Sequence, residues 1–325
     1  MRVAFDSRPA ANHGGIGRYT RCLLGALREN GPGDVVESHD PRRVDVFHAP
    51  WIDGALLRSP VPMVVTLHDL IPLNRRGEYL RSGIRFRLRY LAVQRAVRVI
   101  VPTRAVAEDA IAHLGIPADR LVVIAEATAP TFHPRSDEEV DAVRKRYGLP
   151  SDYLLWVGGL RHPDLLRRVA ALARTRRAMP LVLAGQNGPW TNALPDVTLT
   201  GGVSDDELAA IYTGAHALVF PSDDEGFGLA PVEALACGAP VVACDVPTVR
   251  EMLDGRARFV AVDDLEGLIA AAEAAVRPAP IPPPWTWRDA AEKTWEVYQE
   301  AAVAPPVWRG ARRRRIRPAE ADQKA

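Results

Sequence analysis

The sequence has little of what marks secreted, disulfide-rich or nucleic-acid-binding proteins. Only three of its 325 residues are cysteines, and the odd number and scattered placing of Cys22, Cys237 and Cys244 argue against a disulfide framework. We therefore expect reduced thiols that pack as small hydrophobic side chains. A formal net charge of +1 excludes a general attraction to nucleic acid or to acidic membranes.

Long apolar runs are also missing. No run approaches the roughly 20 residues that span a bilayer. The first residues, Met1 to Asp6, lead into a strand and a polar loop without the apolar region of a signal peptide. These absences predict a cytoplasmic protein, and its length suffices for two domains that each have a hydrophobic core.

The most informative stretch has a strand, a loop, a helix and a second strand. Apolar runs predict buried strands at 217–220 and 240–244, with a helix at 229–237 between them. The loop before the helix falls at the carboxyl end of a strand, where open α/β sheets bind ligands. Glu225 lies in this loop beside two glycines, which let a ligand approach the backbone. Its simpler interpretation is a surface acid that complements the helix dipole.

Glu233 is harder to explain as a surface residue. It is the only charged residue between Leu229 and Cys237, in a helix that is otherwise apolar or small on every side. A buried carboxylate without a partner is costly, so Glu233 must meet a hydrogen-bond donor. That donor is either a neighbouring loop of the protein or a ligand such as the hydroxyls of a sugar.

A second glycine-rich loop follows the first predicted strand, 3–5. The residues Gly14-Gly15-Ile16-Gly17-Arg18 precede a predicted helix at 19–28. A dehydrogenase-type dinucleotide fingerprint fails here, because Thr20 stands where the third glycine belongs and 31–43 reads as a loop without the expected strand.

Two histidines end predicted strands, at 44–48 and 61–68. His68 is the stronger candidate for a ligand site, since Asp69 follows it at the ligand side of the sheet, and His48 is the weaker one. A structural histidine is the simpler interpretation of either. We reject metal ligation because no third ligand with suitable spacing accompanies His68 and Asp69.

Together these segments identify a family resemblance. Glu225-Gly-Phe-Gly-Leu, with Glu233 eight positions later, resembles the E-x7-E signature of retaining glycosyltransferases of the GT-B fold, family 4. The Gly14-Gly-Ile-Gly-Arg-Tyr and Val65-Thr-Leu-His-Asp segments are similar to the same family. The resemblance implies an α/β protein with two Rossmann-like, doubly wound domains that face each other across a cleft. We expect an acceptor-side domain at 1–149, a donor-binding domain at 150–284, a helix at 285–303 that crosses back to the first domain, and a basic, disordered tail at 304–325.

The resemblance also implies roles for individual residues. Glu225 and His68 are the expected catalytic residues at the donor sugar, and Glu233 is expected to hold the ribose hydroxyls. The remaining expected donor-binding residues line the sugar and diphosphate; they are Gly15, Gly17, Gly158, Arg161, Gly226, Phe227, Gly228 and Leu229. Pro163 and Asp164 stand where the family has a basic pair for the diphosphate, so we expect Arg161, His162, Arg167 or Arg168 to replace that pair.

The implied activity is transfer of a hexose, such as mannose or glucose, from a nucleoside-diphosphate sugar to a lipid-linked, polysaccharide or small-molecule acceptor. The donor is a co-substrate, and no metal or other cofactor is implied. The alternatives are a catalytically weak nucleotide-sugar-binding subunit and a sugar-nucleotide epimerase or hydrolase of the same fold. An arginine-dense helix at 78–96 is read as a solvated face; the alternative is peripheral contact with the inner face of the membrane. No specific nucleic-acid partner is expected for the arginine-rich tail.

Overall fold

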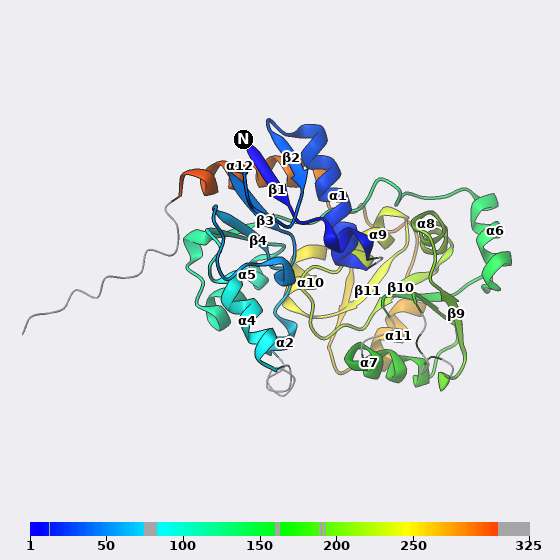
Figure 1. Cartoon of the computed structure of the whole chain (residues 1–325). Helices are drawn as coiled ribbons and strands as arrows, with labels where there is room; N and C mark the ends of the chain where they lie inside the picture. The colour runs from blue at the N-terminus through cyan, green and yellow to red at the C-terminus, as the bar shows by residue number, and fades with distance from the viewer. Residues whose placement is uncertain are drawn as a thin grey trace, which may run out of the picture.

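The protein consists of two α/β units that lie side by side (Figure 1). The structure, a computed structural model, describes residues 1–12, 14–74, 83–159, 163–186, 188, 191 and 193–304. The expected donor-binding residue Arg161, with His162, lies outside the described residues, as does the arginine-rich part of the tail.

The first unit is built on a parallel sheet. Within the described residues its strand order is β2-β1-β3-β4-β5-β6. The bounds are β1 (Arg2–Phe5), β2 (Asp34–Glu37), β3 (Val46–Ala49), β4 (Met63–Thr66), β5 (Arg98–Val101) and β6 (Leu121–Val123). The central strands are apolar runs because helices cover both faces of a parallel sheet. Strand β2 pairs with β1 as an edge strand, so the interpretation of 31–43 as loop alone was wrong.

Among its described residues, the first unit has four helices and three short 3-10 turns. The helices are α1 (Gly15–Asn30), α2 (Ile71–Asn74), α4 (Gly83–Val93) and α5 (Arg104–Leu114), and the turns are Arg8–Ala11, Ile52–Gly54 and Ala118–Arg120. Helix α1 begins at Gly15 rather than at Tyr19, so the glycine-rich segment forms its first turn. A Cβ on Gly17 would lie 1.9 Å from the Asn12 carbonyl oxygen. Glycine at that position therefore lets the preceding loop pack against the helix.

The second unit repeats the arrangement with the strand order β12-β11-β10-β7-β8-β9 in the part of the chain described. Its strands are β7 (Leu154–Val157), β8 (Leu181–Ala184), β9 (Val197–Gly201), β10 (Ala217–Phe220), β11 (Val241–Cys244) and β12 (Arg258–Val260). Its helices are α6 (Asp137–Tyr147), α7 (Pro163–Arg174), α8 (Asp205–Gly214), α9 (Leu229–Ala236), α10 (Pro247–Leu253) and α11 (Leu265–Glu273). Helix α6 packs on α8, and Val143 and Leu149 join the core around Tyr153, so this core begins before residue 150.

The last described helix, α12 (Trp287–Val303), crosses back onto the first unit and packs along α1, as expected (Figure 1). Trp295 donates a hydrogen bond to the Leu27 carbonyl oxygen at 3.1 Å, and Tyr298 lies in the core with β1. The three cysteines are free. Among the described helices, none has the length and apolar character to cross a membrane.

Candidate active site

The loop that carries Glu225 lies against the first unit. A Cβ on Gly226 would lie 1.8 Å from the His68 carbonyl oxygen, and the Thr103 hydroxyl donates to the Gly226 carbonyl oxygen at 3.3 Å. His68 follows β4 and Thr103 follows β5, so the loop meets the carboxyl ends of the first sheet. The structure therefore brings together Glu225, Gly226 and His68 at the boundary between the two units.

Two helix N-termini approach each other at this boundary. A Cβ on Gly15, the first residue of α1, would lie 3.9 Å from Leu229 Cδ1, and Leu229 is the first residue of α9. Gly228, the N-cap of α9, has a φ of 84°, which glycine adopts with least strain. The first turn of a helix leaves backbone N–H groups unpaired and carries the positive end of the helix dipole. Two such ends form an arrangement suited to a diphosphate.

Glu225 has few hydrogen-bond partners for a half-buried carboxylate. The Ser222 hydroxyl donates to its Oε1 at 2.7 Å. Burial raises the pKa of Glu225 to about 7, and the negative charges of Asp69 and Asp224 add to the rise, while the Ser222 bond opposes it. The protein thus leaves this carboxylate poorly compensated, which makes it the side chain of the loop best suited to accept from a ligand.

The His68 ring is fully engaged with acceptors of the first unit. Its Nδ1 lies 2.9 Å from Glu126 Oε1, and its Nε2 lies 2.9 Å from the Pro50 carbonyl oxygen. Because both partners are acceptors, both ring nitrogens must carry protons, and the ring is a cation. Burial lowers the pKa of His68, but the bond and charge of Glu126 outweigh it, so the pKa is raised overall. His68 can therefore supply positive charge, whereas neither nitrogen is free to take a proton.

His48 is a structural residue. Its ring nitrogens lie 2.6 Å from the Tyr298 hydroxyl and 2.9 Å from the Thr66 hydroxyl. Burial lowers the pKa of His48 to about 3, so the ring is neutral and joins α12 to the first sheet.

Glu233 is held from both sides of the boundary. Its side chain is 1% exposed; Arg18 Nη1 lies 2.5 Å from Oε1, and the Tyr212 hydroxyl donates to Oε2 at 3.1 Å. Burial raises the pKa of Glu233, and the charge of Arg18 opposes that rise. The donor that this carboxylate required is thus an arginine from the first unit. Sequence reasoning missed Arg18 as a site residue, since the two residues are 215 positions apart.

Other residues expected at the donor site make contacts within the protein. Phe227 is 4% exposed and packs against Trp285 in a tilted arrangement with the ring centroids 5.6 Å apart, so its backbone rather than its ring can face a ligand. Gly158 follows β7, and a Cβ there would lie 2.7 Å from the Trp156 ring. Arg168, expected as a replacement for the basic pair, donates instead to the carbonyl oxygens of Pro221 and Val262.

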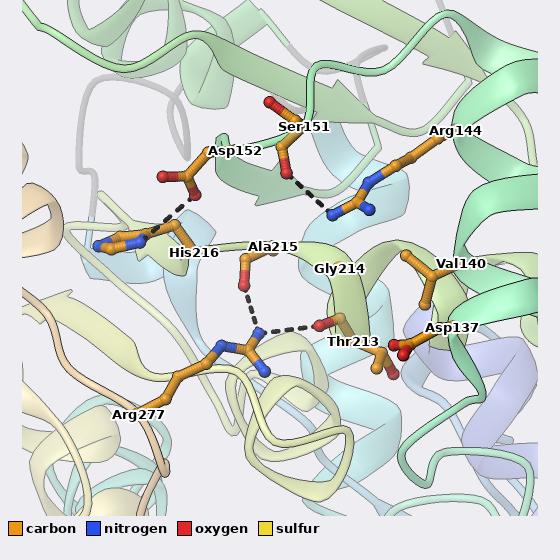
Figure 2. A pocket seen from close by; sticks show the side chains of 10 residues that line it. All are labelled: Asp137, Val140, Arg144, Ser151, Asp152, Thr213, Gly214, Ala215, His216 and Arg277. Atoms are coloured by element: carbon orange, nitrogen blue, oxygen red, sulfur yellow. Dashed lines mark hydrogen bonds and ion pairs between the residues drawn. The ribbon is translucent and has the colours of Figure 1, made fainter.

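A polar cavity of about 360 Å³ lies elsewhere in the second unit (Figure 2). It is lined by α6, by Ser151 and Asp152 before β7, and by Thr213 to His216 before β10. These are the amino ends of the strands, at the edge of the sheet opposite the loop of Glu225. Arg144 and Arg277 donate to backbone carbonyls of these turns (Figure 2). None of the expected site residues lines this cavity, so it is not the site described above.

The fold and the paired loops define a GT-B glycosyltransferase, and comparison with known proteins agrees. The family model "Glycosyltransferase Family 4" matches residues 18–128, and "Glycosyl transferases group 1" matches residues 151–277. The chain belongs to this family of glycosyltransferase enzymes, family 4.

Its relatives include a D-inositol 3-phosphate glycosyltransferase from Thermobispora bispora. The two are 30% identical over 88% of this chain and 76% of that protein. The Escherichia coli mannosyltransferase WbdA is 28% identical over 60% of this chain, which spans only 26% of the length of WbdA. Among solved structures, Anabaena HepE in complex with UDP and glucose has a TM-score of 0.65 at 15% identity, covering 93% of this chain and 95% of HepE. That last likeness concerns the fold.

Proposed function

We propose that the protein transfers a hexose from a nucleoside-diphosphate sugar to an acceptor with retention at the anomeric carbon, without a metal ion. The observation that carries this proposal is the half-buried Glu225, which has few donors of its own and stands beside two approaching helix N-termini. In this arrangement the diphosphate lies between the first turns of α1 and α9, and the sugar lies at Glu225. The assigned roles of His68, Glu233 and the glycine-loop backbone are part of the proposal.

The electrostatics fit the charges that develop in such a reaction. As the bond from the anomeric carbon to the diphosphate oxygen breaks, its electron pair leaves with the diphosphate, and positive charge grows on the sugar ring. Backbone N–H groups of Gly15 to Gly17 and of Gly228 and Leu229 can stabilise the leaving group. The carboxylates of Glu225 and Asp69, of which Asp69 lies close enough to raise the pKa of Glu225, favour a positive sugar. The acceptor oxygen then bonds to the same face of the anomeric carbon, and its proton passes to the departing diphosphate.

The donor and acceptor are proposed from relatives. HepE binds UDP and glucose, and WbdA is a mannosyltransferase, so glucose and mannose are the first sugars to test. The D-inositol 3-phosphate glycosyltransferases suggest a phosphorylated small-molecule acceptor. A lipid-linked or polysaccharide acceptor fits the mannosyltransferase relatives.

The test is to incubate the purified protein with UDP-, GDP- and ADP-sugars and to measure nucleotide release with and without candidate acceptors. We expect release that depends on an acceptor, persists in EDTA and yields a product with the donor's anomeric configuration. Release that is independent of any acceptor would favour a hydrolase. Binding without turnover across the acceptors would favour a nucleotide-sugar-binding subunit.

A peripheral location at the inner face of the membrane is proposed from helix α4. Leu88 and Leu91 are 40% and 46% exposed and lie among exposed arginines, including Arg87. Such a mixed face suits anionic lipid. Sedimentation with vesicles should therefore depend on anionic lipid and weaken in a variant with Arg87→Ser and Leu91→Ser; equal sedimentation with neutral vesicles would contradict the proposal.

A further inference from the structure

One arginine joins the two units at the proposed donor site. Arg18 is 11% exposed; its Nη1 lies 2.5 Å from Glu233 Oε1, and its Nη2 lies 2.5 Å from Asp205 Oδ1. Its guanidinium also stacks 4.9 Å from the centre of the Phe132 ring. A single side chain from the first turn of α1 therefore reaches both α9 and the first residue of α8.

Under the proposed function, Arg18 occupies the position at Glu233 that the ribose needs. A guanidinium offers two N–H groups to a carboxylate, and a ribose diol offers two O–H groups to the same oxygens. Glu233 is 1% exposed, so a ribose can reach its carboxylate only by displacing a neighbour, and the neighbours that bond it are Arg18 and Tyr212. Tyr212 is fully buried in the core of the second unit, whereas Arg18 comes from across the boundary. Arg18 is therefore the partner that can leave.

The position of Arg18 in α1 also determines where it can go. Side chains of a helix lean towards its N-terminus, so Arg18 lies over the turn that begins at Gly15. That turn faces Leu229 and the N-terminus of α9, which is where the proposed function puts the diphosphate. A released guanidinium there would meet two phosphate groups with the fork geometry that suits them.

We propose that Arg18 is an exchangeable donor-binding residue: it holds Glu233 until the ribose takes that carboxylate, and then contacts the diphosphate of the donor. The inference rests on the proposed function. It accounts for how the chain can bind a diphosphate although Pro163 and Asp164 replace the basic pair of the family and Arg168 is held by carbonyl oxygens. The donor's ribose and its diphosphate are thereby recognised together.

The test compares the affinities of a nucleoside, its monophosphate and its diphosphate, measured by calorimetry, for the base that the wild-type protein binds. A charge-assisted contact of this kind corresponds to a factor of about 10 to 100 in affinity. We expect Arg18→Met to lower the affinity for the nucleoside diphosphate by about that factor. Its affinity for the nucleoside should stay within about threefold of wild type or increase. Arg18→Lys keeps the positive charge but not the two-pronged guanidinium, so its affinity for the diphosphate should lie between those of Arg18→Met and wild type. Arg28→Met, at the exposed end of the same helix, should match wild type.

Glu233→Gln should show the opposite pattern, with weaker nucleoside binding and an unchanged gain from the phosphates. This variant and Arg18→Lys keep the inference testable if Arg18→Met does not fold. Equal losses for nucleoside and diphosphate in the Arg18 variants, or no loss for either, would overturn it. If the wild-type protein binds no nucleoside diphosphate, the proposed function fails, and the inference fails with it.

Discussion

The two glutamates of the E-x7-E segment are eight residues apart, but the protein treats them in opposite ways. Glu233 is enclosed in α9 and has a cationic partner and a hydroxyl donor. Glu225, in the loop before α9, accepts from one serine, and its pKa is raised to about 7. Low exposure alone therefore does not identify the carboxylate that can bind a ligand. The number of hydrogen-bond donors that the protein itself provides does. Under the proposed function, Glu225 is therefore the catalytic residue, and Glu233 belongs to an interaction that the donor rearranges.

The largest expected effect is on stability at Glu233. Arg18→Met leaves a buried carboxylate without its cation, and breaking one partner of a buried ion pair costs about 3–5 kcal/mol. We expect urea unfolding to show a loss of that size, and the double variant Arg18→Met, Glu233→Met to regain most of it. A double variant as unstable as the single one would show that the pair itself is not the cause.

Turnover should depend more on Glu225 than on Glu233. Glu225→Gln removes the negative charge facing the sugar, and we expect kcat to fall more than about one hundredfold with little change in donor affinity. Glu233→Gln should mainly raise the KM of the donor. Asp224→Asn, in the same loop, serves as the matched control. A near-normal kcat in Glu225→Gln would contradict the catalytic role proposed for Glu225.

The close contact between the Glu225 loop and His68 can be disrupted without substituting either of these two residues. Gly226→Ala places a Cβ 1.8 Å from the His68 carbonyl oxygen, so the backbone must shift. We expect a loss of about 1–3 kcal/mol in stability, together with reduced turnover. Gly25→Ala is the control, because a Cβ there meets nothing within 4 Å inside α1; that variant should be slightly more stable. Similar behaviour of the two variants would contradict the contact.

The smallest effect expected is a pH dependence of stability from Glu225. Its pKa is about 7 in the folded protein against a usual 4.5, so between these values the folded chain holds a proton that the unfolded chain has lost. This stabilisation is present below pH 4.5 and is lost as the pH rises through 7. We therefore compare the unfolding free energies of Glu225→Gln and wild type in urea at pH 5 and at pH 8. From pH 5 to pH 8 the difference should shift by about 2 kcal/mol in favour of the variant, allowing for partial solvent screening. Parallel pH curves would show that Glu225 is not desolvated.

Much of the fold follows from local signals. Strand β10 has the bounds predicted from the sequence, because 217–220 is a continuous apolar run. Helix α5 is bounded by local signals, since Thr103 caps its start and Gly115 ends it in the left-handed region. Strand β2 was missed because it is a short edge strand with acidic ends, Asp34 and Glu37, which lacks a long apolar pattern. The start of α1 was missed because glycines favour loops unless a close contact, here with Asn12, requires them.

The surroundings of the two glutamates could be predicted only in part. The pattern around Glu225 and Glu233 predicted the loop and the helix that carry them, and Arg18 and Tyr212 confirm that Glu233 needs a donor. Its partner could not be found in the same way, since Arg18 becomes its neighbour only when two separate units pack together. The same limit applies to His68, whose protonation depends on Glu126, 58 residues away along the chain. Long-range pairs of this kind leave no local pattern.

The most direct measurement is a crystal structure of the protein with the nucleoside diphosphate that it binds most tightly. We predict that the diphosphate lies between the first turns of α1 and α9, that the ribose hydroxyls bind Glu233, and that the Arg18 guanidinium moves from Glu233 to the phosphates. A nucleotide bound in the cavity of Figure 2, or bound at the boundary with the Arg18–Glu233 pair intact, would contradict it.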